Sequence, residues 1–417
     1  MPTSATLAEV DTLVGPTWAP PAVTPELSRA QEPRVAADVT VEVAGNARLA
    51  EIQPEWRDLA ARADVPNVFM HPMLIALGAC YPGVRCRTLL AWQERNGRKT
   101  LVGCWAFAAG RAPRSIIPLS VLAAPPFPHA YLSAPVIDRD ALDETTAAML
   151  DCIADDPGLP KIVALEAMRE DGATMQALQR VLAARGSTPA VLRRCSRPML
   201  ESKLDGKQYL EKALSSSTRK KLRQHRRRLG EKGALESKIV SEPEAVVRAV
   251  EDFLELEASG WKGHKGSALL NNQADATFTR EMMTALSVQG EAAIHALTLD
   301  GKPVAMQIVL RAGSTAFTWK TAYDEALRDF SPGMLLLEDY TAALLADRDI
   351  ACVDSCSYDD SGFMGAWSER QAMMELWFDA RRGGSAAFAH VTRLQDIYLR
   401  LRAQAKAAYL TRLRGRK

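Results

Sequence analysis

The stretch FTWKTAYDEALRDFSPGMLLLEDYTAALL, residues 317–345, changes in character halfway along its length. Aromatic and β-branched residues at 317–323 predict a strand, and the apolar residues from 335 onward predict a helix. Between them stands Ser331-Pro332-Gly333, which carries no bulky side chain. One interpretation is an ordinary turn, because Pro and Gly both favour turns. The other is a helix start that an anion approaches closely, because free N–H groups and the helix dipole attract negative charge there.

The length and composition of the chain limit the possible classes of protein. A chain of 417 residues is too long for one ordinary core and indicates two domains. A hydrophobic content of 47% with 24% charged residues is typical of a globular protein rather than a disordered or membrane-embedded one. The net charge of +2 excludes a molecule that binds polyanions over its whole surface, so any basic function must be local.

The seven cysteines are scattered, and none forms a CxxC pair. We therefore expect reduced thiols and no metal site, which favours the cytoplasm. The N-terminus has no basic segment followed by an apolar core, and no apolar run approaches the length of a membrane span. The expected location is cytoplasmic, with possible peripheral association with the inner membrane.

The first half of the chain predicts a leader followed by one α/β unit. Residues 1–38 are rich in Pro, Ala, Thr and Glu and predict a flexible leader. Residues 39–195 predict an N-terminal lobe. Its expected elements are strands at 39–43, 88–92, 101–108 and 162–166 and helices at 47–63, 142–154 and 174–185. The Asn96-Gly97 turn predicts that the second and third strands form a hairpin.

The second half predicts elements in a related order, which suggests a duplication. Residues 196–390 predict a C-terminal lobe, and residues 391–417 predict a basic C-terminal helix. The lobe is expected to contain helices starting at 209, 242 and 275, strands at 292–299, 304–311 and 315–323, the Ser-Pro-Gly segment with its helix, and strands at 351–357 and 372–378. This is not the alternation of a Rossmann sheet, and no phosphate-binding GxGxxG or GxxxxGK[ST] motif occurs. It is the order of the GNAT acyltransferase fold, in which the segment between the fourth strand and the next helix wraps the pyrophosphate of acyl-CoA.

Three segments carry a family resemblance: SSSTRKKLRQHRRRLGEKG (215–233), ASGWKGHKGSALL (258–270) and YDEALRDFSPGMLLLEDYTAAL (323–344). They resemble GNAT acetyltransferases of the CelD/BcsL type, relatives of the FemAB peptidyltransferases, over about residues 53–378. The resemblance implies an α/β (α+β) fold of tandem GNAT-like lobes, each a mixed, largely antiparallel sheet flanked by helices. It also implies that the N-terminal lobe is degenerate and that the C-terminal lobe binds acyl-CoA.

The resemblance further implies an acyl-CoA-dependent N-acyltransferase, most simply an N-acetyltransferase, that modifies an amine of a cell-envelope component. The expected acceptor is an amino sugar of an exopolysaccharide or holdfast-type polymer, and the donor is acetyl-CoA or a longer acyl-CoA. Three alternatives stay open. The chain could acylate a sphingoid amine as ceramide synthases do, use aminoacyl-tRNA as FemX-like peptidyltransferases do, or be a non-catalytic scaffold that binds a polysaccharide or nucleotide.

One segment departs from the family pattern. Many relatives carry Gly-Asp and Tyr-Lys before a Trp near the end of the second lobe, and others carry a His. This chain has DSCSYDDSGFMGAWSER at 354–370, with neither Lys nor His. The resemblance therefore does not identify the group that handles the proton.

Acyl transfer to an amine needs a proton acceptor, donors for the oxyanion, and a proton for the leaving thiolate. The candidate catalytic residues are Asp324, Glu325, Tyr323, Tyr358, Asp354 and His264. The candidate cofactor-binding residues are Ser331, Pro332, Gly333, Lys320 and Arg328, and the candidate substrate-binding residues are Trp261, Lys262 and Asp359. Each has a structural alternative: the acids could cap turns, the tyrosines and Trp261 could pack, and a lone His is often structural.

Two basic segments suggest anionic partners. Residues 219–232 carry eight Lys and Arg residues beside a leucine stripe at helical spacing, which predicts an amphipathic helix with a basic face. That face could contact anionic lipid headgroups, an anionic polymer or tRNA phosphates, or could simply be solvated. The absence of interleaved aromatic residues makes nucleic acid the unlikely partner. Arg381-Arg382-Gly383-Gly384, upstream of the Arg-rich C-terminus, could hold a cyclic dinucleotide, because guanidinium groups pair with phosphates.

Overall fold

The computed structural model describes residues 34–414 except 37–38, 113–114, 116–117 and 358–362. One mixed, 14-stranded sheet runs through the molecule in the order β1-β2-β3-β4-β5-β7-β14-β8-β13-β12-β11-β10-β9, with β6 paired to β4. The strands are β1 (Arg34–Ala36), β2 (Val39–Ala44), β3 (Cys86–Arg95), β4 (Arg98–Arg111), β5 (Ser120–Ala124), β6 (Val136–Ile137), β7 (Ile162–Arg169), β8 (Ala190–Leu200), β9 (Leu235–Val240), β10 (Ala292–Leu299), β11 (Lys302–Ala312), β12 (Thr315–Tyr323), β13 (Cys352–Asp354) and β14 (Glu369–Asp379).

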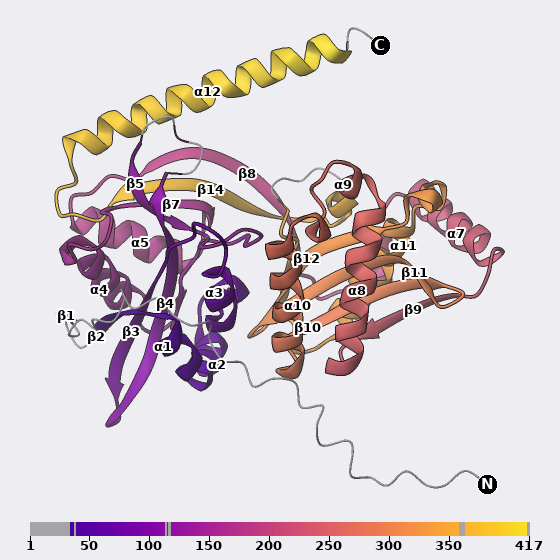
Figure 1. Ribbon diagram of the computed structural model, residues 1–417, viewed down its shortest axis with the longest axis horizontal. Coiled ribbons are helices and arrows are strands. Elements are labelled where there is room, and N and C mark those ends of the chain that lie inside the picture. Colours follow the sequence, from indigo (N-terminus) through magenta and orange to yellow (C-terminus); the bar gives the residue numbers. More distant parts are fainter. Residues whose placement is uncertain (1–33, 37–38, 113–114, 116–117, 358–362, 415–417) are drawn as a thin grey trace.

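Helices cover both faces of this sheet (Figure 1). They are α1 (Asn46–Glu51), α2 (Gln53–Arg62), α3 (Pro72–Gly78), α4 (Leu142–Asp155), α5 (Ala173–Ala184), α6 (Gly206–Ala213), α7 (Ser216–Gly230), α8 (Pro243–Ser259), α9 (Trp261–His264), α10 (Gln273–Val288), α11 (Pro332–Ala346) and α12 (Ala386–Arg414). Among the described strands, only the β5–β7 and β12–β13 pairs are parallel, so the sheet is mixed but largely antiparallel. The expected fold class is confirmed.

The two halves of the chain repeat one strand pattern and exchange their last strands. In each half, four strands form an antiparallel series, β2 to β5 and β9 to β12, and a fifth strand pairs parallel to the fourth. The sixth strand crosses over: β14 from the second half lies beside β7, and β8 from the first half lies beside β13. Both strands bridge the two groups of elements in Figure 1. The expected boundary between residues 195 and 196 falls inside β8.

Several expected elements have the predicted positions, and others differ. The meander β10–β12, the hairpin β3–β4 and the helix α11 lie where the sequence predicts them. The helix expected at 47–63 is divided into α1 and α2, and the helix expected from 209 is divided into α6 and α7. The second division occurs because Ser215 caps α7, its Oγ accepting a hydrogen bond from the Thr218 N–H. Residues 34–36, within the expected leader, form β1, and the rest of that leader, residues 1–33 and 37–38, lies outside the described residues.

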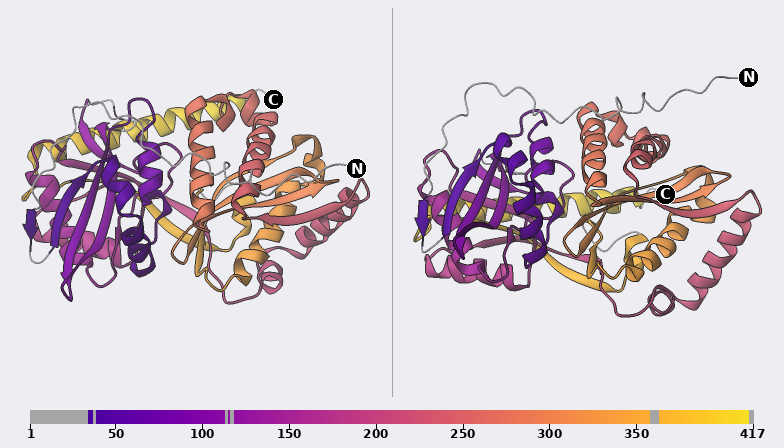
Figure 2. Two further views of the ribbon diagram at one scale, coloured as in Figure 1. Left: turned by 60° about the horizontal axis from the view of Figure 1, so that its bottom comes forward. Right: turned by 90° about the horizontal axis from the view of Figure 1, so that it is seen from below.

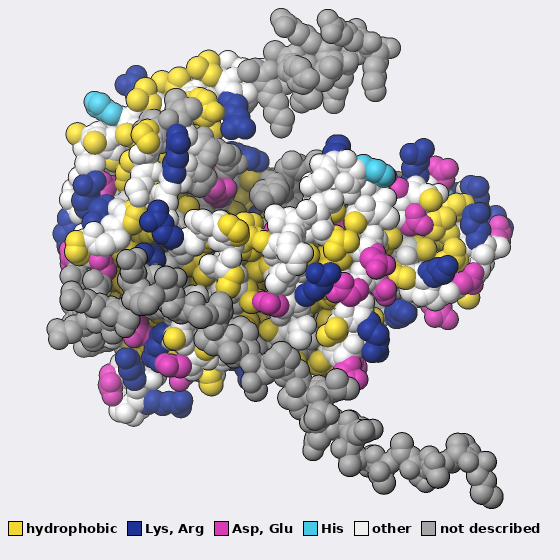
Figure 3. Space-filling view, viewed as in Figure 1, with side chains coloured by type: hydrophobic (Ala, Val, Ile, Leu, Met, Phe, Trp, Pro, Cys, Tyr) yellow, Lys and Arg dark blue, Asp and Glu magenta, His cyan; other side chains and the backbone are white. Residues whose placement is uncertain are grey.

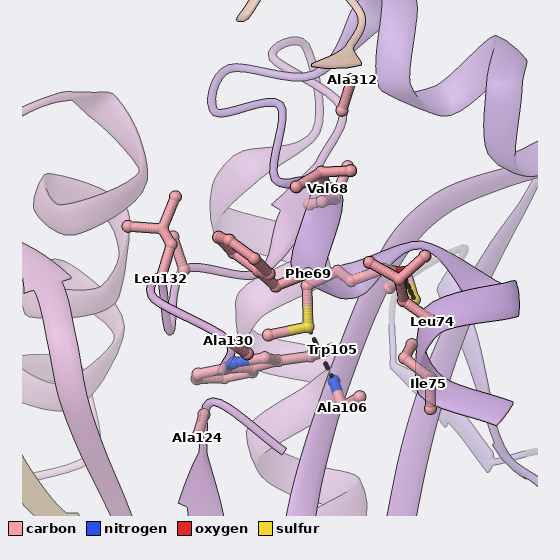
Figure 4. Packing of buried hydrophobic residues seen from close by; sticks show 14 of the residues in the cluster. Val68, Phe69, Leu74, Ile75, Trp105, Ala106, Ala124, Ala130, Leu132 and Ala312 are labelled. Carbon is pink, nitrogen blue, oxygen red and sulfur yellow. Dashed lines mark hydrogen bonds between the residues drawn. The ribbon is translucent and has the colours of Figure 1, made fainter. Parts of the chain in front are cut away.

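The hydrophobic core is continuous across the two halves. The short 3₁₀ turn η2 (Val68–Met70) brings Phe69 against Tyr131 of the first half and against Phe317 of β12, with ring centroids 5.8 and 5.5 Å apart. Figure 4 shows Phe69 packed among side chains that include Ala312 at the end of β11. Apolar contact therefore fixes the second-half sheet against the first half.

The helix α12 begins against β8 and β14 and extends along the outside of the molecule (Figures 1 and 2). Its side chains Leu394, Ile397 and Leu401 are exposed. Within the part of the chain that the structure describes, no helix has both the length and the apolar character needed to cross a membrane.

Candidate active site

The start of α11 has the open geometry that an anion seat needs. Ser331 adopts the left-handed conformation, with φ 51° and ψ 52°, and its side chain does not cap the helix. The N–H groups of Met334 and Leu335 both donate to the Ser331 carbonyl oxygen, and Pro332 has no N–H. The Gly333 N–H donates to no described residue. A Cβ at Gly333 would lie 3.6 Å from Cδ1 of Tyr323, so a small ligand atom can approach the backbone there.

The strand that precedes this helix has an unpaired edge. The parallel strands β12 and β13 pair only from Thr315 to Phe317, after which β13 ends at Asp354. A register shift between Ile308 and Val309 of β11 marks a bulge on β12 at the same level. Beyond it, from Thr318 to Tyr323, β12 is paired with no described strand other than β11, and within this stretch the Thr321 carbonyl oxygen accepts a hydrogen bond from Lys262.

The predicted acids at the end of β12 act as caps. Asp324 Oδ1 accepts a hydrogen bond from the Ala326 N–H at 2.8 Å, which starts the 3₁₀ turn η4 (Glu325–Phe330). Glu325 Oε1 accepts one from the Trp261 N–H at 2.8 Å and so holds α9 against η4. Tyr323 lies beside Gly333. Arg328 is exposed, and none of the described contacts involves its side chain.

The predicted residue Asp354 is fully buried and paired. Its carboxylate lies 3.2 Å from the Arg197 guanidinium and accepts a hydrogen bond from the Cys356 N–H at 2.8 Å. Arg197 comes from β8 of the first half, so this ion pair also joins the two halves. Burial raises the pKa of the Cys356 thiol well above its usual value, which disfavours a thiolate nucleophile there. Tyr358 and Asp359 lie outside the described residues.

The predicted residues of the Gly-rich loop have different environments. The Lys262 ammonium pairs with buried Glu257 at 2.7 Å and donates to the Thr321 carbonyl oxygen of β12. Trp261 has an exposed fraction of 46%, and Lys265 lies over its ring. His264 is exposed, and no described side chain contacts its ring through a hydrogen bond. Of the three, only Lys262 is close to the strand edge.

Lys320 belongs to a polar cluster that the sequence did not indicate. Its Nζ lies 3.2 Å from Nδ1 of His129, which belongs to the Pro-rich loop of the first half. Nε2 of the same ring lies 3.1 Å from Oδ1 of Asp275 on α10. The Lys320 ammonium also lies over the rings of Tyr131 and Trp319, 5.5 and 5.6 Å from their centroids. The described contacts of Lys320 are with this cluster rather than with residues 331–333.

Burial controls the charges in this cluster. Burial and the nearby Lys262 lower the pKa of Lys320 to about 8, against the opposing effect of Glu257 and Asp275. Burial and the Lys320 ammonium lower the pKa of His129, although Asp275 opposes the shift. An adjacent cavity of about 50 Å³ is lined by residues from both halves, among them Tyr131 and Arg197 of the first half and Met373 of the second.

The basic helix α7 packs against the start of α11. Leu222, His225 and Leu229 are its buried face, and Arg226 pairs with Asp339 at 2.7 Å and donates to the Leu335 carbonyl oxygen. Arg228 and Lys232 lie over the ring of Phe330, just before the Ser-Pro-Gly segment. A surface groove of about 580 Å³ separates α7 from the start of β9 and is lined by three arginines of the helix. Lys and Arg side chains gather there with acidic ones (Figure 3).

The arginines of the predicted nucleotide site are already paired. Arg381 contacts Asp379 at 2.6 Å, and Arg382 contacts Asp151 at 3.2 Å. No group of three or more His, Cys, Asp or Glu side chains within the described ranges has the arrangement of a metal site.

Comparisons with known proteins place these features in a fold family. Residues 216–361 match the model of the acetyltransferase (GNAT) domain. The structure of FemX is similar with a TM-score of 0.54, at 13% sequence identity, over 78% of this chain and 95% of that chain. A tandem GNAT protein from the clavulanic acid biosynthesis pathway gives a TM-score of 0.40, at 13% identity, over 84% of this chain and 99% of that one. No curated protein matches the sequence significantly.

The domain match supports acyl transfer in general and leaves its details open. The domain match covers the meander, the Ser-Pro-Gly segment and α11, which together form the candidate site. The likeness to FemX, at its low identity, concerns the fold alone. The CelD/BcsL type, the acceptor and the individual site residues are not identified by either comparison.

Proposed function

We propose that the chain is an acyl-CoA-dependent N-acyltransferase whose donor site lies in the second half. The observation that carries this proposal is the open start of α11, which follows directly on a strand with an unpaired edge. The Gly333 N–H and the positive end of the α11 dipole would hold the pyrophosphate. The extended arm of the donor would then run along β12 and exchange hydrogen bonds with its free backbone groups.

The distance along β12 from the phosphate seat indicates where the thioester of the donor would lie. From Tyr323, beside the phosphate seat, to Lys320 is three strand residues, or about 10 Å at the usual rise per residue. The extended arm that joins the pyrophosphate of acyl-CoA to its sulfur is longer than this, so it would bring the thioester at least as far as the polar cluster between the two halves. In this arrangement Tyr323, Asp324 and Glu325 shape the phosphate end, and the proton is handled elsewhere.

The proposed acceptor is an amine of a cell-envelope component, with an amino sugar of an exopolysaccharide first and a sphingoid amine second. The support for this choice is the family resemblance. The exposed basic side chains of α7 fit an anionic membrane surface, which would hold a lipid-linked acceptor near the site. Such a protein would work at the cytoplasmic face of the inner membrane.

Titration calorimetry with acetyl-CoA and palmitoyl-CoA tests the donor. We expect heat of binding with at least one of them, and the better ligand indicates the length of the acyl chain. Well-folded protein that gives no heat with either would overturn the proposal. Release of free thiol from acyl-CoA, measured with and without aminoacyl-tRNA, separates this activity from a FemX-like peptidyltransferase.

A further inference from the structure

His129 is held against the second-half sheet by three separate contacts. It adopts a left-handed backbone conformation, with φ 64°, that residues other than glycine rarely take. Its carbonyl oxygen accepts a hydrogen bond from Nε1 of Trp319 at 2.8 Å, and its ring contacts Lys320 and Asp275. Backbone strain of this kind persists where the surroundings fix the residue, and it is concentrated at functional sites.

The contacts of the ring determine where its proton lies. The Asp275 carboxylate can only accept a hydrogen bond, so Nε2 of neutral His129 carries the hydrogen. Nδ1 then has a free electron pair, and this pair faces the Lys320 amine at 3.2 Å. Asp275 therefore fixes the tautomer, and His129 can receive a proton from Lys320.

We propose that Lys320 is the general base of the acyl transfer, that His129 takes the proton onward from it, and that Asp275 positions His129. This inference rests on the proposed function and deepens it, because it assigns the proton chemistry of the same site. It also makes the active site depend on both halves of the chain, since His129 belongs to the first half.

The proposed reaction begins with deprotonation of the acceptor amine. The acceptor ammonium gives one proton to the Lys320 amine, which passes a proton through His129 to water. The neutral acceptor nitrogen then forms a bond with the thioester carbon. When the C–S bond breaks, the second nitrogen proton goes to the leaving thiolate, and the products are an amide and the free thiol of the donor.

The surroundings of Lys320 keep its neutral form accessible. Burial is the largest influence on its pKa, and Lys262 adds to it, whereas Glu257, Asp275 and the Cys356 thiol act in the opposite direction. The resulting pKa of about 8 is within the range in which a lysine can exchange protons near neutral pH. The flanking rings of Tyr131 and Trp319 limit access of water to the amine.

Two labelling experiments on the full chain test the proposal without knowledge of the acceptor. In the first, formaldehyde with cyanoborohydride, a small reagent that methylates neutral amines, is applied from pH 6 to 10, and modified lysines are located by mass spectrometry. We expect half-maximal labelling of Lys320 near pH 8, well below the ordinary lysine value of 10.5, and the exposed Lys302 serves as the reference residue. Asp275→Asn should lower the Lys320 midpoint, since Asp275 raises the pKa, and Asp252→Asn on the exposed face of α8 should not change it. Equal midpoints for Lys320 and Lys302 would overturn the proposal.

In the second experiment, acetyl-CoA is added without any acceptor amine. Neutral Lys320 should then attack the bound thioester itself, so we expect at least tenfold more acetylation at Lys320 than at Lys302, increasing through pH 8. Gly333→Glu should reduce this acetylation while leaving labelling by the small reagent unchanged. Acetyl-CoA that binds by calorimetry yet acetylates both lysines equally would refute the placement of Lys320 at the thioester. Absence of binding by calorimetry would instead remove the proposed function itself.

Discussion

Gly333 allows the phosphate seat to be tested with one side chain. Gly333→Glu should block close approach to the backbone and place a negative charge beside the phosphates. Losing one charge-assisted contact of roughly 1.5–3 kcal/mol predicts acyl-CoA binding that is weaker by roughly tenfold to a hundredfold. Calorimetry measures the affinity, and the melting temperature should change little because Gly333 is only partly buried.

Gly333→Ala is the control that adds a Cβ without a charge. The added Cβ would be in ordinary van der Waals contact with Tyr323, at 3.6 Å, and would bring no charge. We expect this variant to bind acyl-CoA almost as well as the unmodified chain. If Gly333→Glu also keeps both its affinity and its melting temperature, the Ser-Pro-Gly segment is only a turn.

His295 should make the folded protein sensitive to acid. Burial within β10, beside the ring of Tyr340, lowers its pKa from 6.5 to about 4. Between these two pH values the unfolded chain binds a proton at His295 and the folded chain does not. The free energy of unfolding therefore decreases as the pH falls from about 6.5 towards 4. The loss amounts to about 3 kcal/mol when complete. Urea unfolding at pH 7 and pH 5 should show a smaller difference for His295→Leu, and the exposed His264→Leu should behave like the unmodified chain.

At the scale of elements, α7 offers a test of membrane association. Its exposed basic residues are Lys220, Lys221, Arg223, Arg227 and Arg228, and the exposed Lys232 follows its end. Replacing the first three by Gln should weaken sedimentation with phosphatidylglycerol vesicles by roughly a hundredfold, at about 1 kcal/mol per charge. Removing three exposed charges elsewhere, at Arg98, Lys99 and Lys302, should have a much smaller effect. Equal losses in both variants would mean that α7 is a solvated face.

Elements with local sequence signals could be predicted, and those without them could not. The strands of the β10–β12 meander alternate with Gly-containing turns, and Gly301 and Gly313 indeed have positive φ values. In contrast, β9 is an edge strand with mostly exposed side chains, so it lacks an apolar pattern. The strand β8 contains three arginines and a proline, and its pairing with β14 and β13 is what holds it in the sheet.

The residues of the candidate site also differ in whether a local sequence signal marks them. The open helix start at Ser331 and Gly333 is formed by residues that are neighbours in the sequence, so the local sequence could indicate it. The contact of Lys320 with His129 joins residues 191 positions apart, and no local pattern marks a histidine in a Pro-rich loop as its partner. The acids at 324 and 325 show why local sequence could not assign their role, because a capping carboxylate and a catalytic one have the same local signature, and both accept backbone N–H hydrogen bonds in the structure.

At the scale of the whole molecule, the exchanged strands make the two halves interdependent. The strand β14 lies between β7 and β8, where it buries Leu376, Trp377 and Phe378 almost completely. The turn between β11 and β12 also touches the first half, because a Cβ at Gly313 would lie 2.6 Å from the Ala60 carbonyl oxygen. The polar cluster at Lys320 therefore sits between two halves that are fixed by both sheet pairing and close packing.

The first half should consequently not fold without β14. A fragment of residues 1–205 lacks three large buried side chains, and at about 2–5 kcal/mol for each truncation their loss is comparable with the whole stability of a domain, about 5–15 kcal/mol. Joining the end of β8 to β14 by a short turn should restore folding, because Met199 pairs with Glu369 and the two strands are antiparallel. We expect cooperative thermal unfolding, followed by near-ultraviolet circular dichroism, for the joined fragment and not for residues 1–205. A cooperative transition of equal stability in both fragments would show that β14 is dispensable to the first half and that the lobes are separate domains.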